Sequence, residues 1–384
     1  MKILNFVLFF LGLCVNICAL AASTQEQIKL SHSQFEEPLV FNVFLPSGYS
    51  KDTQKEYITL FDFHPYSHTY LSGMHDWMSH NGEWPWLKTI IVTPAYGNRA
   101  GMLFDETGKT TPLLDFFDLQ LFPHIDKNYR TNGFRIMSGF RTNGTIVLSA
   151  LLNKPNMINA YIAISPELKD DYVRILSTAN EVLAKLNDKP RFLLFSHGTN
   201  VKEQHQMGSY ELLHEALKNR APSKLNWHYQ HFAQNYFMSL PLVSVIMGVE
   251  KLFDDIHTGL PPESEIAQKG VASIVAHYRY LSEQKYGFEV SPKNSINRLG
   301  EYTLGTDPVK GIAVLEHLIK LYPEDSYSYH SLASAYSQIG DYEAAVKHQE
   351  TAVELAKSRQ TWHQNKHKSA LEDYRLKLNS QISN

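Results

Sequence analysis

The sequence predicts an α/β domain with a mostly parallel sheet, followed by a small α-helical domain built from repeats. Three observations support this fold class. Short apolar runs alternate with helical patterns as far as residue 232, which is typical of a parallel sheet covered on both faces. Beyond residue 260 no further run of the buried-strand type follows. In that last part, small and aromatic residues recur at a fixed spacing, as in helical repeat proteins.

Seven short runs are expected to be strands, because each is rich in β-branched, aliphatic or aromatic residues. They cover residues 40–45, 57–63, 88–94, 134–138, 160–164, 190–195 and 226–232. The segments between them carry apolar residues at helical spacing. Helices are therefore expected at residues 113–125, 145–152, 170–186 and 210–217.

The last part of the chain, residues 261–384, is expected to be α-helical. Residues 263–285 form one long helical pattern, and a charged helical pattern at 362–379 is expected to be a solvating cap. Between them, two units have tetratricopeptide spacing, through Gly311 and Pro323 in the first and, in the second, Leu332, Ala333, Tyr336, Gly340, Tyr342, Ala345 and Ala352. Two units are fewer than such arrays usually need, so we expect them to dock on the α/β domain of residues 22–260.

Composition narrows the function classes. The 384 residues are 43% hydrophobic and carry a net charge of −3, from 36 basic and 39 acidic side chains. No long basic run is present, so nucleic-acid binding has no compositional support.

Residues 1–21 are expected to be a signal peptide. Lys2 precedes an apolar run, and Ala19-Leu20-Ala21 fits a small-residue cleavage site. The segment is short for a membrane span. Both cysteines, Cys14 and Cys18, lie within it, so the mature chain would have neither disulfides nor thiol chemistry. We expect a bacterial protein that is periplasmic or secreted, with no membrane attachment after cleavage.

Residues 135–144 have the pattern of a strand, a tight turn and the start of a helix. Gly139 and Gly144 frame the turn, and Arg141 lies between them. Helix N-termini favour anions, and Arg141 adds positive charge there. We expect Arg141 either to bind a carboxylate- or phosphate-bearing ligand or to pair with an internal acid such as Glu203 or Asp62.

Several motifs resemble the esterase-D-like branch of α/β hydrolases, which includes siderophore esterases and S-formylglutathione hydrolases. The resemblance covers about residues 29–357. Its motifs are Leu45-Pro46-Ser47-Gly48-Tyr49, Phe122-Pro123-His124-Ile125-Asp126-Lys127-Asn128-Tyr129-Arg130, Leu151-Leu152-Asn153-Lys154-Pro155, Ala163-Ile164-Ser165-Pro166 and Leu240-Pro241. It implies an α/β-hydrolase fold and, in working members, hydrolysis of carboxylic esters.

The resemblance also implies where catalytic residues would stand. Such enzymes need an activated serine, a histidine and an orienting carboxylate. Spacing back from Pro155 puts Arg141 at the serine position, and Phe237 stands at the histidine position. Glu203 is the one carboxylate in the loop after residues 190–195 that could be the acid. Neither a guanidinium nor a phenyl ring can do the work that the resemblance requires.

Relocated residues are the alternative. Thr142 could act as nucleophile one position along, with His231 as its base. Ser138, His197 and His228 are further candidates, but histidines on strands and loops more often have structural roles.

A second polar group follows the strand expected at residues 57–63. Asp62, His64 and Tyr66 would lie at the carboxyl edge of the sheet, where ligands bind in such folds. A metal site there would draw on His64, His68, His75 and Asp76, but their spacing matches no recognised motif. We therefore expect a polar, aromatic loop beside a pocket for a small anionic or aromatic ligand, and neither metal nor cofactor.

Three functions remain open from the sequence. The first is a degenerate esterase-like protein that binds a ligand or acts as an accessory protein. The second is an active carboxylic-ester hydrolase that uses relocated residues. The third is an interaction protein that binds a protein partner through its helical tail.

Overall fold

The computed structural model describes residues 23–383, apart from 80–84, 98, 104 and 106–108. The expected signal peptide therefore lies outside the described residues. One eight-stranded sheet has the order β1-β2-β4-β3-β5-β6-β7-β8. Its strands are β1 (Thr24–Leu30), β2 (Leu39–Leu45), β3 (Tyr57–Asp62), β4 (Thr89–Pro94), β5 (Thr131–Phe140), β6 (Ala160–Ile164), β7 (Arg191–Gly198) and β8 (Leu225–Phe232).

Six strands, β3 to β8, pair in parallel, while β2 joins β1 and β4 antiparallel. This confirms the predicted fold class. All seven expected strands are present, and β1 is additional. Its sequence, TQEQIKL, is mostly exposed at the sheet edge, so it lacks the apolar signal that the other strands carry.

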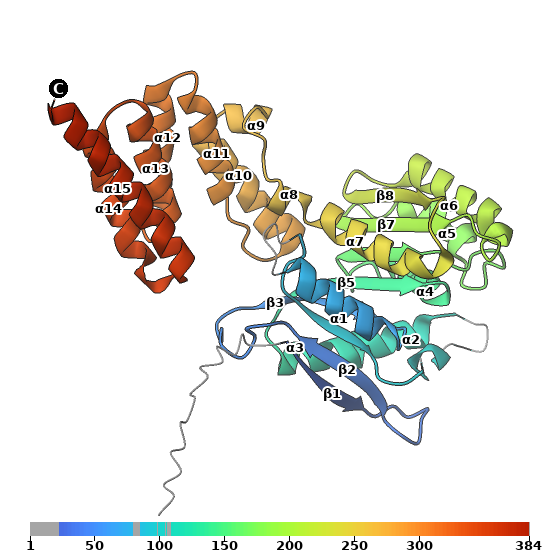
Figure 1. Ribbon diagram of the computed structural model, residues 1–384. Helices are drawn as coiled ribbons and strands as arrows, with labels where there is room; N and C mark the ends of the chain where they lie inside the picture. The colour runs from blue at the N-terminus through green and yellow to red at the C-terminus, as the bar shows by residue number, and fades with distance from the viewer. Residues whose placement is uncertain (1–22, 80–84, 98, 104, 106–108, 384) are drawn as a thin grey trace, which may run out of the picture.

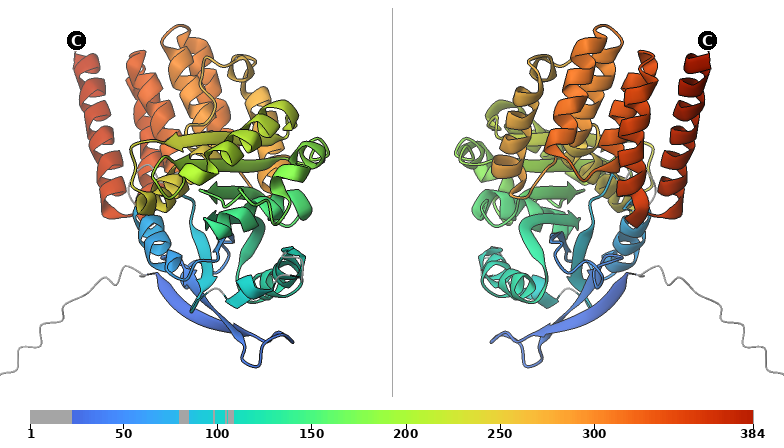
Figure 2. Two further views of the ribbon diagram at one scale, coloured as in Figure 1. Left: turned by 90° about the vertical axis from the view of Figure 1, so that its right-hand side faces the viewer. Right: turned by 90° about the vertical axis from the view of Figure 1, so that its left-hand side faces the viewer.

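Helices cover both faces of the sheet (Figures 1 and 2). One face of the sheet packs against α2 to α6, and the other packs against α1 and α7. Neighbouring strand residues serve opposite faces: Leu193 lies in the first core and Leu194 in the second, as strand geometry requires. The helices are α1 (Ser67–Met78), α2 (Thr111–Phe116), α3 (Phe122–Asn128), α4 (Thr142–Asn153), α5 (Ile175–Leu183), α6 (Met207–Arg220) and α7 (Leu240–Leu252).

The expected helix at 113–125 is interrupted, because a π-helical turn, η2 (Phe117–Leu121), separates α2 from α3. The helix expected at 170–186 is shorter, since α5 begins only at Ile175 after Arg174 takes a left-handed conformation. The loop expected after β3 is largely a helix, α1. Its apolar spacing is weak in the sequence, and burial of Leu71 and His75 stabilises it.

The remaining helices form a second region, joined to the sheet through α7 and α8 (Figure 1). They are α8 (Asp254–His257), α9 (Glu265–Gln268), α10 (Val271–Tyr280), α11 (Lys293–Leu304), α12 (Pro308–Leu321), α13 (Ser326–Gln338), α14 (Tyr342–Leu355) and α15 (Thr361–Ser383). A single helix over 263–285 was the wrong expectation. Gly270, with φ of +99°, separates α9 from α10 because that backbone conformation is outside the helical range.

The helical region packs on the sheet domain through a shared core. Phe134 of β5 contacts Tyr286, with ring centroids 5.7 Å apart, and Phe253 lies 6.1 Å from the same ring. The Tyr286 hydroxyl donates to the carbonyl of Leu252 at 2.7 Å. Lys285 pairs with Asp255 at 2.6 Å. None of the described helices is long and apolar enough to cross a bilayer.

A candidate ligand pocket at the elbow turn

The turn between β5 and α4 is sharp and strained. Arg141 has φ of 58° and ψ of −123°, a conformation that side-chain-bearing residues rarely adopt. The flanking glycines permit the close crossing of backbones. A Cβ at Gly139 would lie 2.4 Å from the carbonyl oxygen of Asn143, and one at Gly144 would lie 2.8 Å from that of Ile164. This is the elbow geometry that lifts a nucleophile above an α/β-hydrolase sheet, and Arg141 stands at its apex.

A pocket of about 530 Å³ lies above this turn. Its apolar wall comes from Phe140, Phe237, Met238 and Leu242. Its polar side chains are Arg141, Thr142, Glu167 and Lys202, with His64, Tyr66 and Tyr70 at another side. Pockets of this size, apolar with a few convergent polar groups, suit small molecules.

Glu167 is the acid that pairs with Arg141. Its Oε1 accepts from Arg141 Nε at 3.0 Å and from Nη2 at 2.6 Å, and its Oε2 accepts from the Thr142 hydroxyl at 2.7 Å. Glu203 and Asp62, the internal partners expected from the sequence, do not pair with Arg141, because both are buried and hydrogen-bonded to other groups. The Arg141 and Glu167 side chains are 56% and 33% exposed, so water weakens their attraction.

The relocated residues do not form a nucleophile–histidine pair. The Thr142 hydroxyl donates to Glu167, and the Ser138 hydroxyl donates to Asp62 at 2.6 Å. His231 is exposed on β8 and stacks on His197, with ring centroids 4.8 Å apart. Among the described residues at this turn, no hydrogen bond joins a hydroxyl to a histidine side chain.

Phe237 lies in the pocket wall, in the short helix η4 (Phe237–Ser239) that leads into α7. Its ring packs on that of Phe140 with centroids 4.8 Å apart. Two cations lie near the same ring, Arg141 at 6.0 Å and Lys202 at 5.5 Å from its centroid. The position that the resemblance assigns to a histidine therefore adds apolar and cation–π surface.

Glu203 is buried just after β7 and holds its own loop together. It accepts from the Ser165 hydroxyl at 2.6 Å, from the Gly198 N–H at 2.9 Å and from Asn200. Its position after β7 fits the acid of the resemblance, but its hydrogen bonds are structural ones. No imidazole is among these partners.

Asp62 also serves the framework rather than the pocket surface. It is 1% exposed, accepts from Ser138 and accepts from the His64 N–H at 3.0 Å. Burial raises the pKa of its carboxyl, and these hydrogen bonds oppose that rise. His64 and Tyr66 do line the pocket. The Tyr66 N–H is held by His64 Nδ1 at 3.2 Å, so this loop uses its N–H groups internally.

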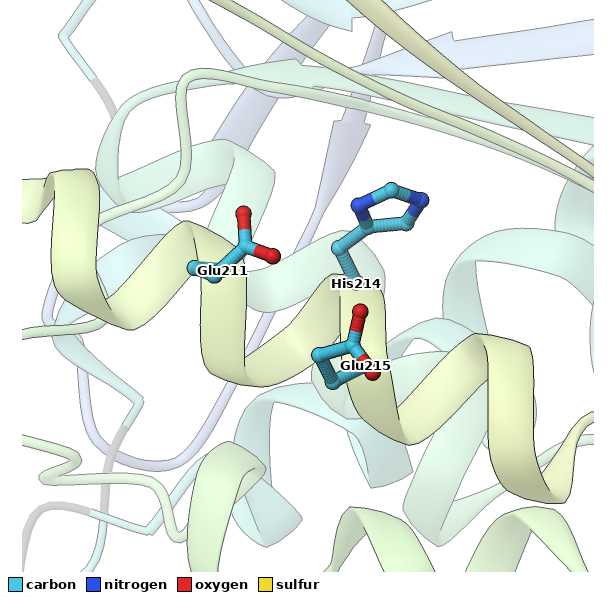
Figure 3. Close-up of side chains that lie close together, drawn as sticks. All are labelled: Glu211, His214 and Glu215. Carbon is cyan, nitrogen blue, oxygen red and sulfur yellow. The ribbon is translucent and has the colours of Figure 1, made fainter.

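A group of possible metal ligands lies elsewhere, on α6. Glu211, His214 and Glu215 present side chains on neighbouring turns (Figure 3). They do not make a convincing centre, because Glu215 pairs with Lys218 at 2.8 Å and His214 stacks on Tyr229 at 3.9 Å. Two of the possible metal ligands named from the sequence also have other partners. His68 Nε2 lies 2.7 Å from Gln25 Oε1, and His75 Nε2 accepts from the Thr89 N–H at 2.9 Å.

Sequence reasoning missed the two further charged residues that line the pocket, Glu167 and Lys202. Glu167 follows β6 by three positions, and Lys202 lies in the loop after β7. Both loops leave the carboxyl ends of parallel strands, where ligand-binding residues gather in such sheets. That rule could have found them, whereas spacing motifs could not.

Comparison with solved structures shows the fold. An IroE-like serine hydrolase from Shewanella oneidensis is 19% identical, with a TM-score of 0.58 over 78% of this chain and 100% of that protein. An uncharacterised protein from Capnocytophaga ochracea DSM 7271 is 14% identical, with a TM-score of 0.64 over 92% and 100%. At these identities the likeness shows the fold alone. That fold is the α/β-hydrolase fold, which the Shewanella oneidensis protein also has.

A tetratricopeptide-repeat family model matches residues 326–359. This confirms the second of the two expected repeat units, which corresponds to α13 and α14. Among curated proteins, no sequence matches this chain.

Proposed function

We propose that this protein is an exported binding or accessory protein that has kept the pocket of an ester hydrolase without its catalytic residues. The observation that carries the proposal is the occupant of the elbow. Arg141 has the strained backbone of a nucleophile, but its guanidinium stays protonated and cannot attack a carbonyl.

The surroundings of Arg141 support the same proposal. Thr142 donates to a carboxylate that Arg141 also holds. Thr142 therefore has a carboxylate that is already engaged as its hydrogen-bond partner, and no described histidine is among its partners. Hydrolysis by Thr142 is disfavoured for that reason. The relocated-residue hydrolase remains the alternative.

The pocket chemistry favours a small ligand that carries both a carboxylate and an aromatic ring. Arg141 and Lys202 supply positive charge, and the N-terminus of α4 adds to it. Phe140, Phe237 and Tyr66 supply aromatic surface. Arginine binds carboxylates through two parallel hydrogen bonds. In this structure Arg141 donates two hydrogen bonds to a single oxygen of Glu167.

The test of lost catalysis is an assay with short p-nitrophenyl esters. We expect no turnover by the wild type above that of buffer. The double variant Arg141→Ser/Phe237→His shows whether the pocket still admits such esters. Wild-type turnover that disappears in Thr142→Val would refute the proposal and favour the relocated-residue hydrolase.

The test of ligand binding is calorimetric titration with an aromatic carboxylate such as 4-nitrobenzoate. We expect Arg141→Met to weaken binding by roughly tenfold or more, because a charge-assisted hydrogen bond contributes about 1.5–3 kcal/mol. Arg220→Met is the matched control, since Arg220 is exposed at the far end of α6. Equal affinities in both variants would contradict the role of Arg141.

A second candidate function is protein binding by the helical region. A groove of 470 Å³ lies between α11, α13 and the start of α15, and the repeat match covers part of it. Because this region shares its core with the sheet, substitutions in the groove are a better test than deletion. Loss of a captured partner in Asn297→Ala/Ser331→Ala, with the pocket variants unaffected, would favour this function.

A further inference from the structure

The C-terminal helix α15 is attached by few buried side chains. Of its 23 residues, His367, Leu371 and Tyr374 are the buried ones. The helix packs against α14 and reaches α13 at three places. The ring of His367 lies against Tyr327 and His330, Tyr374 packs with Ala333, and His363 Nδ1 lies 2.7 Å from the Tyr327 hydroxyl. It lies at the outer end of the helical region in both Figures 1 and 2. Among the buried side chains that attach α15, His367 is the one that can gain a proton near neutral pH.

His367 is fully buried, and neither of its ring nitrogens has a hydrogen-bond partner among the described residues. Its ring lies edge-on to Tyr327 and His330 of α13, with centroids 4.8 Å and 5.2 Å away. Its backbone carbonyl accepts from Gln349 Nε2 at 2.9 Å, and Gln349 Oε1 lies 2.9 Å from His330 Nδ1. An imidazole in this environment packs as a neutral aromatic ring, since a charged ring would need acceptors.

The groups around His367 offer no compensation for a positive charge. Helix α13 contributes Tyr327 and His330, and α14 contributes the uncharged Gln349. Arg359, His363 and Lys366 lie on the segment leading into α15 and on α15 itself, and each disfavours the protonated ring. The carboxylate of Asp325 is held by Arg359 and Lys293, at 3.1 Å each.

We propose that α15 is a pH-responsive latch, in which protonation of His367 releases α15 from α13 and α14. Release would open the groove whose lining includes Tyr327 and His330 on one side and Arg359 and Lys366 on the other. Near neutral pH the docked α15 would keep Lys366 in the groove lining, and in acid the released helix would remove it.

The direction of the effect follows from proton linkage. Burial, followed by repulsion from His330, lowers the pKa of His367 from 6.5 to about 4. The released helix therefore binds a proton more readily than the docked one. Docking is at full strength above pH 6.5 and weakens as the pH falls towards 4. Between pH 7.5 and pH 5 the docked-to-released ratio should fall by about 25-fold.

Hydrogen exchange of the full chain, read by mass spectrometry and corrected for the intrinsic effect of pH, tests the latch. We expect the wild type to lose protection in residues 361–383 between pH 7.5 and pH 5, while β5 and β6 stay protected. His367→Phe keeps an aromatic ring without nitrogens, so its α15 should stay protected at both pH values. His348→Phe is the matched control, because His348 stacks on Tyr336, and it should behave as the wild type does.

Two results would overturn the latch. One is a wild-type α15 equally protected at both pH values, and the other is His367→Phe losing protection as the wild type does. If His367→Phe is already unprotected at pH 7.5, imidazole NMR of the wild type decides instead. A His367 that titrates near its ordinary pKa while α15 stays protected would contradict the proposal.

Discussion

At the scale of single residues, Arg141 replaces a nucleophile without changing the turn that holds it. The positive φ of Arg141 is maintained by the surrounding backbone, through the Arg141 N–H to Ile164 carbonyl bond of 2.9 Å. The side chain pairs with Glu167, which also lines the pocket. Glu167 therefore occupies part of the site where a ligand carboxylate would bind.

This competition leads to a prediction for Glu167. Glu167→Gln should strengthen binding of an aromatic carboxylate, by roughly threefold to tenfold, because the internal carboxylate no longer competes for Arg141. Calorimetric titration with 4-nitrobenzoate measures the change. The neutral analogue 4-nitrobenzamide is the control ligand, and its affinity should not rise. Weaker carboxylate binding in Glu167→Gln would instead show that Glu167 positions Arg141 for the ligand.

At the scale of elements, the β5–α4 unit is built around two close backbone approaches. Gly139 faces the carbonyl of Asn143 at a distance that excludes any Cβ, and Gly144 faces that of Ile164. These contacts place the first turn of α4 directly above the end of β5. The element can therefore hold a strained residue at position 141 whichever side chain that residue carries.

We predict that Gly139→Ala lowers the free energy of unfolding by about 2 kcal/mol or more, because overpacking against backbone cannot be relieved by a rotamer change. Urea denaturation of the wild type and the variant measures this difference in the free energy of unfolding. Gly208→Ala is the matched control in α6, where a Cβ meets nothing within 4 Å. It should be neutral or stabilising by up to about 1 kcal/mol. A Gly139→Ala variant as stable as the wild type would argue against the close approach.

At the scale of the whole molecule, the sheet domain and the helical region share one hydrophobic core. That core contains Leu194 of β7 and Val249 of α7 as well as Leu315 of α12. Phe134, Phe253 and Tyr286 form its aromatic junction. The helical region is therefore held against the amino-terminal part of β5, away from the elbow at the carboxyl end of that strand.

We predict that the two regions unfold together, in one calorimetric transition. Phe134→Ala should cost about 3–5 kcal/mol, since it removes a buried ring from the junction, and should separate the transition into two. Tyr236→Ala is the control, because Tyr236 is 88% exposed. Two transitions in the wild type would show that the regions are energetically independent.

The sequence allowed much of the fold to be predicted, and less of the site. Seven strands were recognisable because their runs are rich in β-branched, aliphatic or aromatic residues. The edge strand β1 was not, since its TQEQIKL sequence has little apolar signal. The break at Gly270 was missed because the flanking residues keep a helical pattern. For the pocket, the resemblance to esterase-D-like hydrolases pointed to Arg141 and Phe237, whereas Glu167 belongs to no motif of that resemblance.

The sequence by itself determined that Arg141 stands at the elbow, because the glycines and the strand–turn–helix pattern are local features. It also indicated the second repeat unit, through residues 332–352, because repeat spacing is a local pattern; the tetratricopeptide-repeat match at residues 326–359 agrees with it. Only the tertiary structure decided that Glu167 pairs with Arg141 and that His367 is buried without a partner. Such pairings depend on which loops and helices meet in space, and side chains distant in sequence leave no periodic signal of their contact.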